Sequence, residues 1–251
     1  QRPDQTPEQS VADAIVYARE KHAEGYLISF SWHARNPCTG ESANYEFWDN
    51  EAQVDIPPLD GTRILEGGDC REQWLAQLDL VANGLAQLEA ENIVILWRPF
   101  HEMNGAWFWW HRQEQQVFVD MWRDMYTYLT ETQGLDNLLW VYSPNTPWDE
   151  WAQRADYYYP GDDVVDLVGL DHYMRVDEET LDLNRYGGYD QMVALGKPFG
   201  LFEFGPIPAS GDGWDSKAYC WSRLLDDIQA TYPQIMLFQA WEYVWQIGRE
   251  P

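Results

Sequence analysis

Short, continuously apolar runs alternate with segments of helical periodicity along almost the whole chain. Six such runs are evident, at residues 26–33, 93–100, 137–144, 163–173, 197–206 and 234–243. Runs of this length that are apolar throughout are typical of parallel strands covered on both faces. The pattern restricts the fold to a doubly wound α/β sheet or a closed (β/α)8 barrel.

Amphipathic segments separate these runs and predict the connecting helices. We expect helices within residues 6–25, 70–92, 113–134, 183–196 and 216–233. The first has Thr6 in position to cap it, Pro7 at the first helical position and Gly25 as its stop.

Polar and aromatic side chains gather where the predicted strands end. They are Trp32, His33, His101, Glu102, Asp171, Tyr173, Glu203, Trp241 and Glu242. A barrel builds its site from the carboxyl ends of many strands, whereas a doubly wound sheet binds at one crevice. The distribution favours an α/β fold of the (β/α)8 TIM-barrel type.

Only six strands are evident, whereas a closed barrel of this type needs eight. Two missing strands would leave unpaired sheet edges. Either two strands precede Gln1 and are absent from this numbering, or the fold is not a complete barrel. Because the chain begins directly at a helix, we expect the first of these. Residues 1–251 are then a single catalytic barrel domain, truncated at its N-terminus.

The net charge of −26, from 16 basic and 42 acidic residues, limits the partners. Such a field repels nucleic acid and anionic lipid, so we expect neither nucleic acid nor membrane as a partner. A neutral polysaccharide would be indifferent to it. The sequence does not fix the oligomeric state, for which a monomer is our expectation.

The three cysteines form no CxxC pair, which argues against a structural zinc site. Cys38 and Cys70 lie in irregular stretches and could form one disulfide, with Cys220 left over; the sequence leaves this open. The chain opens without Met or a signal peptide, as a processed product does. We expect a secreted, periplasmic or extracellular protein.

Two carboxylates, Glu102 and Glu203, each terminate an apolar strand and stand 101 positions apart. Parallel strands of a barrel direct such side chains into one cleft. A facing pair of carboxylates is the minimal machinery of glycoside hydrolysis, and a separation of about 5–5.5 Å indicates the retaining mechanism.

The acid and the nucleophile of a retaining glycosidase require different surroundings. Apolar burial, which raises a carboxyl pKa and retains the proton of an acid, is expected for Glu102. Its sequence neighbours are Pro99, Phe100, Met103, Trp107 and Trp109. Glu203 must stay ionised to attack, and Arg98 or Tyr173 could stabilise its charge. His101 could brace the pair by hydrogen bonding.

The sequence lacks the motifs of several other enzyme classes. The segment HEMNG carries Gly105 where a zinc peptidase would need a second histidine. No GxSxG, P-loop or GxGxxG occurs. We expect no cofactor and no metal.

The segment WRPFHEMNGAWFWW (97–110) resembles glycoside hydrolase family 26, whose best-known members are endo-β-1,4-mannanases. ISFSWHARNP, LLWVYSPN, VGLDHY and FGLFEFGP extend the likeness from Ser10 to about Ile247. The resemblance implies a retaining (β/α)8 enzyme with Glu102 as acid/base and Glu203 as nucleophile.

The same resemblance implies a set of substrate-binding residues. Those matching the subsite of the attacked sugar are His101, Trp107, Tyr173 and Trp241, and those matching further cleft positions are His33 and Arg98. Indole rings stack on the apolar faces of pyranoses, so Trp107 and Trp241 are the expected platforms.

The tryptophans outside this set have other expected roles. Trp32 should point away from the cleft if His33 faces it, because side chains alternate along a strand. Helical spacing predicts packing for Trp74, Trp122 and Trp221, and one of the adjacent Trp109 and Trp110 should be core. Those on loops, which could serve distal subsites, are Trp148, Trp151 and Trp214.

The substrate is less constrained than the reaction. Mannan, galactomannan or glucomannan follows from the resemblance, but the family also acts on mixed-linkage β-glucan and β-1,3-xylan. His111 stands where family members often carry Gly, so the outer sugar subsites can differ. A non-catalytic carbohydrate-binding protein is a third reading, against which the presence of both glutamates argues.

Overall fold

The computed structural model describes residues 5–44, 48–49, 54–55, 57–149, 152–175, 180–207 and 221–241. The chain divides into two compact units. The first comprises Gln1–Val141 and Tyr158–Val165, and the second comprises Tyr142–Tyr157 and Asp166–Pro251. Each unit is described by itself.

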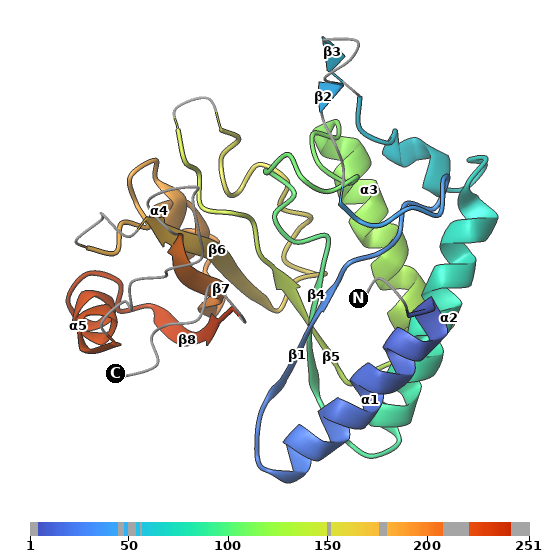
Figure 1. Cartoon of the computed structure of the whole chain (residues 1–251), viewed down its shortest axis with the longest axis horizontal. Coiled ribbons are helices and arrows are strands. Elements are labelled where there is room, and N and C mark those ends of the chain that lie inside the picture. The colour runs from blue at the N-terminus through green and yellow to red at the C-terminus, as the bar shows by residue number, and fades with distance from the viewer. Residues whose placement is uncertain are drawn as a thin grey trace. The chain divides into compact units, whose positions relative to one another are not determined.

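Three parallel strands form the sheet of the first unit (Figure 1). They are β1 (Ile28–Trp32), β4 (Ile95–Pro99) and β5 (Leu138–Tyr142), in the order β1-β4-β5. Every residue of β4 is buried, as the continuously apolar run predicts. Two short antiparallel strands, β2 (Trp48–Asp49) and β3 (Val54–Asp55), pair with each other away from this sheet.

Three helices of the first unit agree with the predicted segments. They are α1 (Pro7–Ala23), α2 (Arg71–Glu89) and α3 (Gln115–Tyr126), which continues as the π-helix η2 (Thr127–Thr132). The 3-10 turn η1 (Gly61–Ile64) lies in a stretch for which no helix is predicted. The predicted cap is confirmed, since Thr6 and Gln9 exchange side-chain-to-backbone hydrogen bonds.

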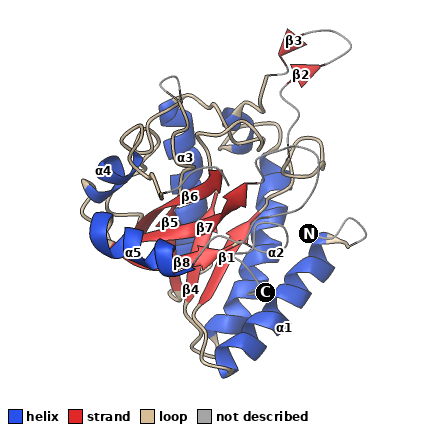
Figure 2. Cartoon of the chain, turned by 60° about the vertical axis from the view of Figure 1, so that its left-hand side comes forward, coloured by secondary structure: helices blue, strands red, loops and turns tan. Residues whose placement is uncertain are grey.

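Helices α1 and α2 lie side by side, as both views show (Figures 1 and 2). Gly84 of α2 faces Val11 of α1, and a Cβ on Gly84 would lie 2.6 Å from Val11 Cγ1. The missing side chain therefore permits the close approach of the two helices.

The second unit contains the remaining three predicted strands, also parallel. They are β6 (Leu167–Arg175), β7 (Phe199–Ile207) and β8 (Ile235–Ala240), in the order β6-β7-β8. Its helices are α4 (Gly188–Val193) and α5 (Trp221–Thr231). The helix expected within 183–196 is short, because Gly187 adopts a left-handed φ of 79° directly before it.

Tryptophans make up much of the core of the first unit. Trp74 and Trp122 are fully buried, which confirms their packing role. Trp109 and Trp110 are also both fully buried, so this adjacent pair contributes two core residues rather than one. The side chains of Trp151, Trp214 and Trp221 lie outside the described residues.

The disulfide left open by the sequence is present, between Cys38 and Cys70. It joins the loop after β1 to the residue that precedes α2. Cys220 lies outside the described residues. Within the described part of the chain, none of the helices has the length and apolar character needed to cross a bilayer.

Removing the disulfide is expected to lower the free energy of unfolding by about 3–4 kcal/mol, because its two cysteines stand 32 positions apart and the bond restricts the unfolded chain. Urea unfolding of Cys38→Ser, Cys70→Ser and the double variant measures this loss. Each single variant should cost as much as the double variant, since all three lose the same bond; additive losses would contradict the pairing.

Candidate active site

In the first unit, Glu102 lies on a tight turn directly after β4. Phe100 and Glu102 adopt φ values of 46° and 54°, a left-handed conformation that non-glycine residues rarely take. The backbone N–H of Gly105 donates to the carbonyl of Glu102 at 2.8 Å and closes the turn. Backbone strain of this kind is concentrated at functional sites.

Glu102 is buried, and an aromatic side chain contacts its carboxyl group. Glu102 is 7% exposed, and its predicted neighbours Phe100, Met103 and Trp109 are buried. The indole Nε1 of Trp107 donates to Glu102 Oε2 at 2.6 Å. The turn thus brings the predicted acid and the predicted sugar platform into direct contact.

Two of the predicted histidines meet in the same unit. The rings of His33, after β1, and His101, after β4, lie edge to face with centroids 4.7 Å apart. Burial lowers the pKa of His101 well below its usual value, and electrostatic interactions with Arg98 and His33 lower it further. His101 is therefore neutral at neutral pH, so it acts as a hydrogen-bonding group rather than a cation.

Arg98 is buried in β4, and only 1% of its surface is exposed. The first unit therefore gathers five predicted site residues at the carboxyl ends of β1 and β4: His33, Arg98, His101, Glu102 and Trp107.

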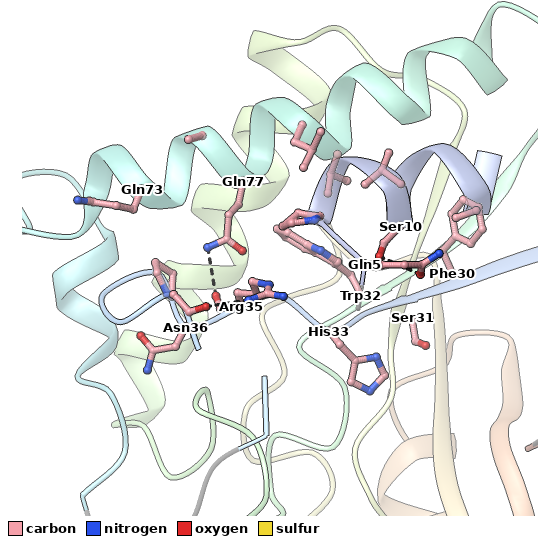
Figure 3. A pocket seen from close by; sticks show the side chains of 18 of the residues that line it. Gln5, Ser10, Phe30, Ser31, Trp32, His33, Arg35, Asn36, Gln73 and Gln77 are labelled. Atoms are coloured by element: carbon pink, nitrogen blue, oxygen red, sulfur yellow. Dashed lines mark hydrogen bonds between the residues drawn. The ribbon is translucent and has the colours of Figure 1, made fainter. Parts of the chain in front are cut away.

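The alternation predicted for β1 is confirmed. Trp32 stacks on Trp74 with ring centroids 5.4 Å apart. Figure 3 shows the Trp32 side chain pointing away from His33, toward the helices. His33 is thereby directed to the face where His101 lies.

A cavity of about 820 Å³ lies between α1, β1 and α2 on the Trp32 side (Figure 3). Its lining includes Trp32 and Gln77, whose Nε2 donates to the carbonyl of Arg35 at 3.1 Å. Neither Glu102 nor Trp107 is among its lining residues. Of the predicted site residues, His33 lines this cavity and also contacts His101.

In the second unit, Glu203 lies on β7 and is 4% exposed. The hydroxyl of Tyr173, on the neighbouring strand β6, donates to Glu203 Oε2 at 2.5 Å. Tyr173, one of the two residues expected near this carboxylate, is therefore in direct contact with it, and its role there stays a prediction.

A second buried carboxylate, Asp171, was not assigned a role from the sequence. It is fully buried, lies opposite Glu203 in the β6/β7 register, and accepts a hydrogen bond from Ser143 Oγ at 2.5 Å. Its position two residues before Tyr173 places both side chains on one face of β6. The alternation of side chains along β6 is the sequence signal that indicates this shared face.

Trp241 directly follows β8, and its backbone N–H donates to the carbonyl of Phe204 at 2.8 Å. It is half-buried. The second unit therefore gathers Asp171, Tyr173, Glu203 and Trp241 at the carboxyl ends of three neighbouring strands.

Two further histidines are buried. His111 donates from Nδ1 to the carbonyl of Phe108, and burial lowers the pKa of this histidine. His172 packs against Phe204 on β7 with ring centroids 6.4 Å apart. Burial lowers the pKa of His172 to about 4, with Asp182 raising it and Arg185 lowering it.

His172 is expected to make stability depend on pH below neutrality. The unfolded chain binds a proton near pH 6.5, whereas the folded protein resists protonation until about pH 4. Stability from this group is complete above 6.5 and declines as the pH falls toward 4, by a total on the order of 3 kcal/mol.

Urea unfolding between pH 7 and 4 tests this dependence. His172→Gln should give a flatter profile than the wild type over that range, whereas His22→Gln, at an exposed position, should follow the wild type. Equal slopes for His172→Gln and the wild type would show that this histidine is not the group responsible.

Comparison with known proteins gives the relatives of the chain. Residues 4–248 match the family model described as glycosyl hydrolase family 26. The chain is 38% identical over 230 residues to a mannan endo-1,4-beta-mannosidase of Bacillus subtilis strain 168, covering 88% of this chain and 57% of the relative. It is 34% identical over 248 residues to mannan endo-1,4-beta-mannosidase A and B of Caldalkalibacillus mannanilyticus, covering 94% and 44%.

Solved structures agree with this relationship. A Bacillus subtilis mannanase superposes with a TM-score of 0.71 at 30% identity, covering 94% of this chain and 64% of the other. A second Bacillus subtilis mannanase gives 0.74 at 29% identity, covering 98% and 69%. The six parallel strands are those of a partial (β/α)8 barrel, which confirms the predicted fold class.

The chain spans about half the length of the two curated relatives, 57% of one and 44% of the other. The expectation that two strands precede Gln1, and that residues 1–251 form one catalytic domain, stays a prediction.

Proposed function

The chain belongs to glycosyl hydrolase family 26, and from that membership we propose that it is a retaining endo-glycosidase that cleaves β-1,4-mannosidic bonds in mannan, galactomannan or glucomannan. The observation that carries this proposal is the like setting of its two glutamates, each within its own unit. Each lies buried at the carboxyl end of a parallel strand, and each accepts a hydrogen bond from an aromatic donor.

In the first step, Glu203 attacks the anomeric carbon and Glu102 gives its proton to the departing glycosidic oxygen. A covalent glycosyl–enzyme results, which requires the two carboxyl groups to approach to about 5–5.5 Å. The Tyr173 hydroxyl stabilises the negative charge of Glu203 before attack.

In the second step, Glu102 acts as the base that takes a proton from water. The water attacks the anomeric carbon and releases Glu203, so the configuration is retained. His101, neutral through burial, can hydrogen-bond to the sugar or to a carboxyl without adding charge. Arg98, Trp107, His33 and Trp241 form the remainder of the proposed sugar site, with the two indoles as platforms.

Mannan is the proposed substrate because the two relatives named above are mannan endo-1,4-beta-mannosidases. A more distant relative, 24% identical over 176 residues, is an endoglucanase H of Acetivibrio thermocellus. A β-glucan substrate on the same scaffold is therefore the second candidate.

Digestion of a panel of polysaccharides separates these candidates. We expect oligosaccharide release from β-mannan, with little from mixed-linkage β-glucan or β-1,3-xylan. Proton NMR at early times should show β-anomers first, as retention requires, and products of several lengths, as internal cleavage requires. Initial α-anomers would contradict double displacement.

Glu203→Ala is expected to lower kcat on β-mannan on the order of 10⁴-fold or more, because no covalent intermediate can form. Reducing-sugar release measures the loss. Glu131→Ala, at an exposed carboxylate of η2, should match the wild type. Undiminished hydrolysis by Glu203→Ala would remove it as the nucleophile.

Glu102→Ala is expected to affect substrates unequally. Natural polymer needs protonation of its leaving oxygen, so its glycosylation rate should fall about 10²–10⁴-fold. An aryl β-mannoside with a good leaving group needs no such proton and should react in a burst, followed by slow turnover. Equal losses in the first step for both substrates would count against the acid role.

Localisation in a periplasmic or extracellular compartment is proposed as well. The Cys38–Cys70 disulfide supports it, since such bonds persist in oxidising compartments. Fractionation of the producing cells, followed by thiol labelling, tests it. The protein should be found in the medium or periplasm with these two cysteines unreactive, and a fully reduced cytoplasmic protein would contradict it.

A further inference from the structure

Gly105 lies in direct contact with the indole ring of Trp107. A Cβ atom built on Gly105 would stand 2.5 Å from Trp107 Cζ2, 2.6 Å from Cη2 and 2.8 Å from Cε2. All three atoms are consecutive members of the six-membered ring of the rigid indole. The indole therefore occupies the space that any side chain at position 105 would need.

This contact, and not the backbone conformation, explains the glycine. The left-handed φ angles of this turn belong to Phe100 and Glu102, whereas Gly105 does not have a positive φ. An alanine could adopt the backbone conformation of Gly105. It could not do so with Trp107 in its present place.

The position of the indole determines its hydrogen bond to Glu102. Relieving a 2.5 Å carbon–carbon contact requires a shift of about 1 Å. The Trp107 Nε1 to Glu102 Oε2 distance is 2.6 Å, and such bonds weaken steeply beyond about 3.2 Å. A side chain at position 105 would consequently break or greatly weaken this bond.

The bond has a consequence for the chemistry of the carboxyl group. An indole Nε1 is a donor only, so Oε2 must accept whether Glu102 is ionised or neutral. In a neutral carboxyl group the carbonyl oxygen is the better acceptor, which directs the proton to Oε1. In the ionised group, the donated hydrogen bond stabilises the charge.

We propose that Gly105 is a positioning residue for the acid/base step, because its lack of a side chain lets Trp107 hold Oε2 of Glu102 and so leaves Oε1 to carry the transferred proton. This inference rests on the proposed function in assigning that proton to glycoside cleavage. The statement that Gly105 permits the hydrogen bond between Trp107 and Glu102 depends only on the contacts within this turn.

The test compares Gly105→Ala, Trp107→Phe and the double variant on β-mannan. Loss of the indole bond destabilises the ionised form of Glu102, so the basic limb of the kcat/KM profile should move upward by roughly 0.5–1 pH unit in both single variants. The double variant should show no further displacement, because both changes remove the same bond.

Gly84→Ala is the matched control, since it creates a similar clash, 2.6 Å from Val11, between α1 and α2. It should lower the melting temperature and leave the basic limb in place. Two results would overturn the proposal. One is a basic limb of the kcat/KM profile that stays at the wild-type pH in Gly105→Ala, and the other is a shift in the double variant equal to the sum of the two single shifts.

An NMR measurement separates this inference from the proposed function. The indole N–H resonance lost in Trp107→Phe identifies Trp107, and in the wild type it should titrate with Glu102. In Gly105→Ala that titration should disappear. If the wild type fails to cleave β-mannan but the NMR result holds, the function is wrong and the positioning is right; a titrating resonance in Gly105→Ala overturns the positioning itself.

Discussion

Parallel pairing of continuously apolar strands is the constraint on which the candidate site depends. Strands that run in one direction end at one edge of their sheet, so any side chain that follows a strand is delivered to that edge. In the first unit this places Glu102 beside the end of β1, and in the second it places Glu203 beside the ends of β6 and β8. The direction of the apolar strands therefore determines the edge of each sheet at which site residues can gather, whatever polar residues follow the strands.

An aromatic donor contacts each of the two carboxylates. Trp107 donates to Glu102, and Tyr173 donates to Glu203. An indole or phenol supplies one directed hydrogen bond to a carboxylate without adding a charge of its own. His101, neutral through burial, likewise adds no charge.

The strands, the two glutamates and the Tyr173 contact could be predicted because each follows from periodicity and strand-end position. The Trp107 bond to Glu102 could not, because it depends on left-handed backbone at Phe100 and Glu102, which no propensity indicates for these residue types. Asp171 was missed for a different reason: its strand was predicted, but alternation was not followed through to the face it shares with Tyr173.

The aromatic cluster after Glu102 also accounts for how that strained turn persists. Left-handed backbone at a non-glycine residue costs about 1–3 kcal/mol and requires surrounding contacts that leave no alternative. Trp109 donates its indole N–H to the carbonyl of Ala34, and Trp110 donates to the carbonyl of His101 inside the turn. Both rings are fully buried, so their hydrogen bonds are shielded from water and costly to lose. The core tryptophans thus hold the backbone that presents the acid, while Trp107 alone of the three contacts its carboxyl group through a described hydrogen bond.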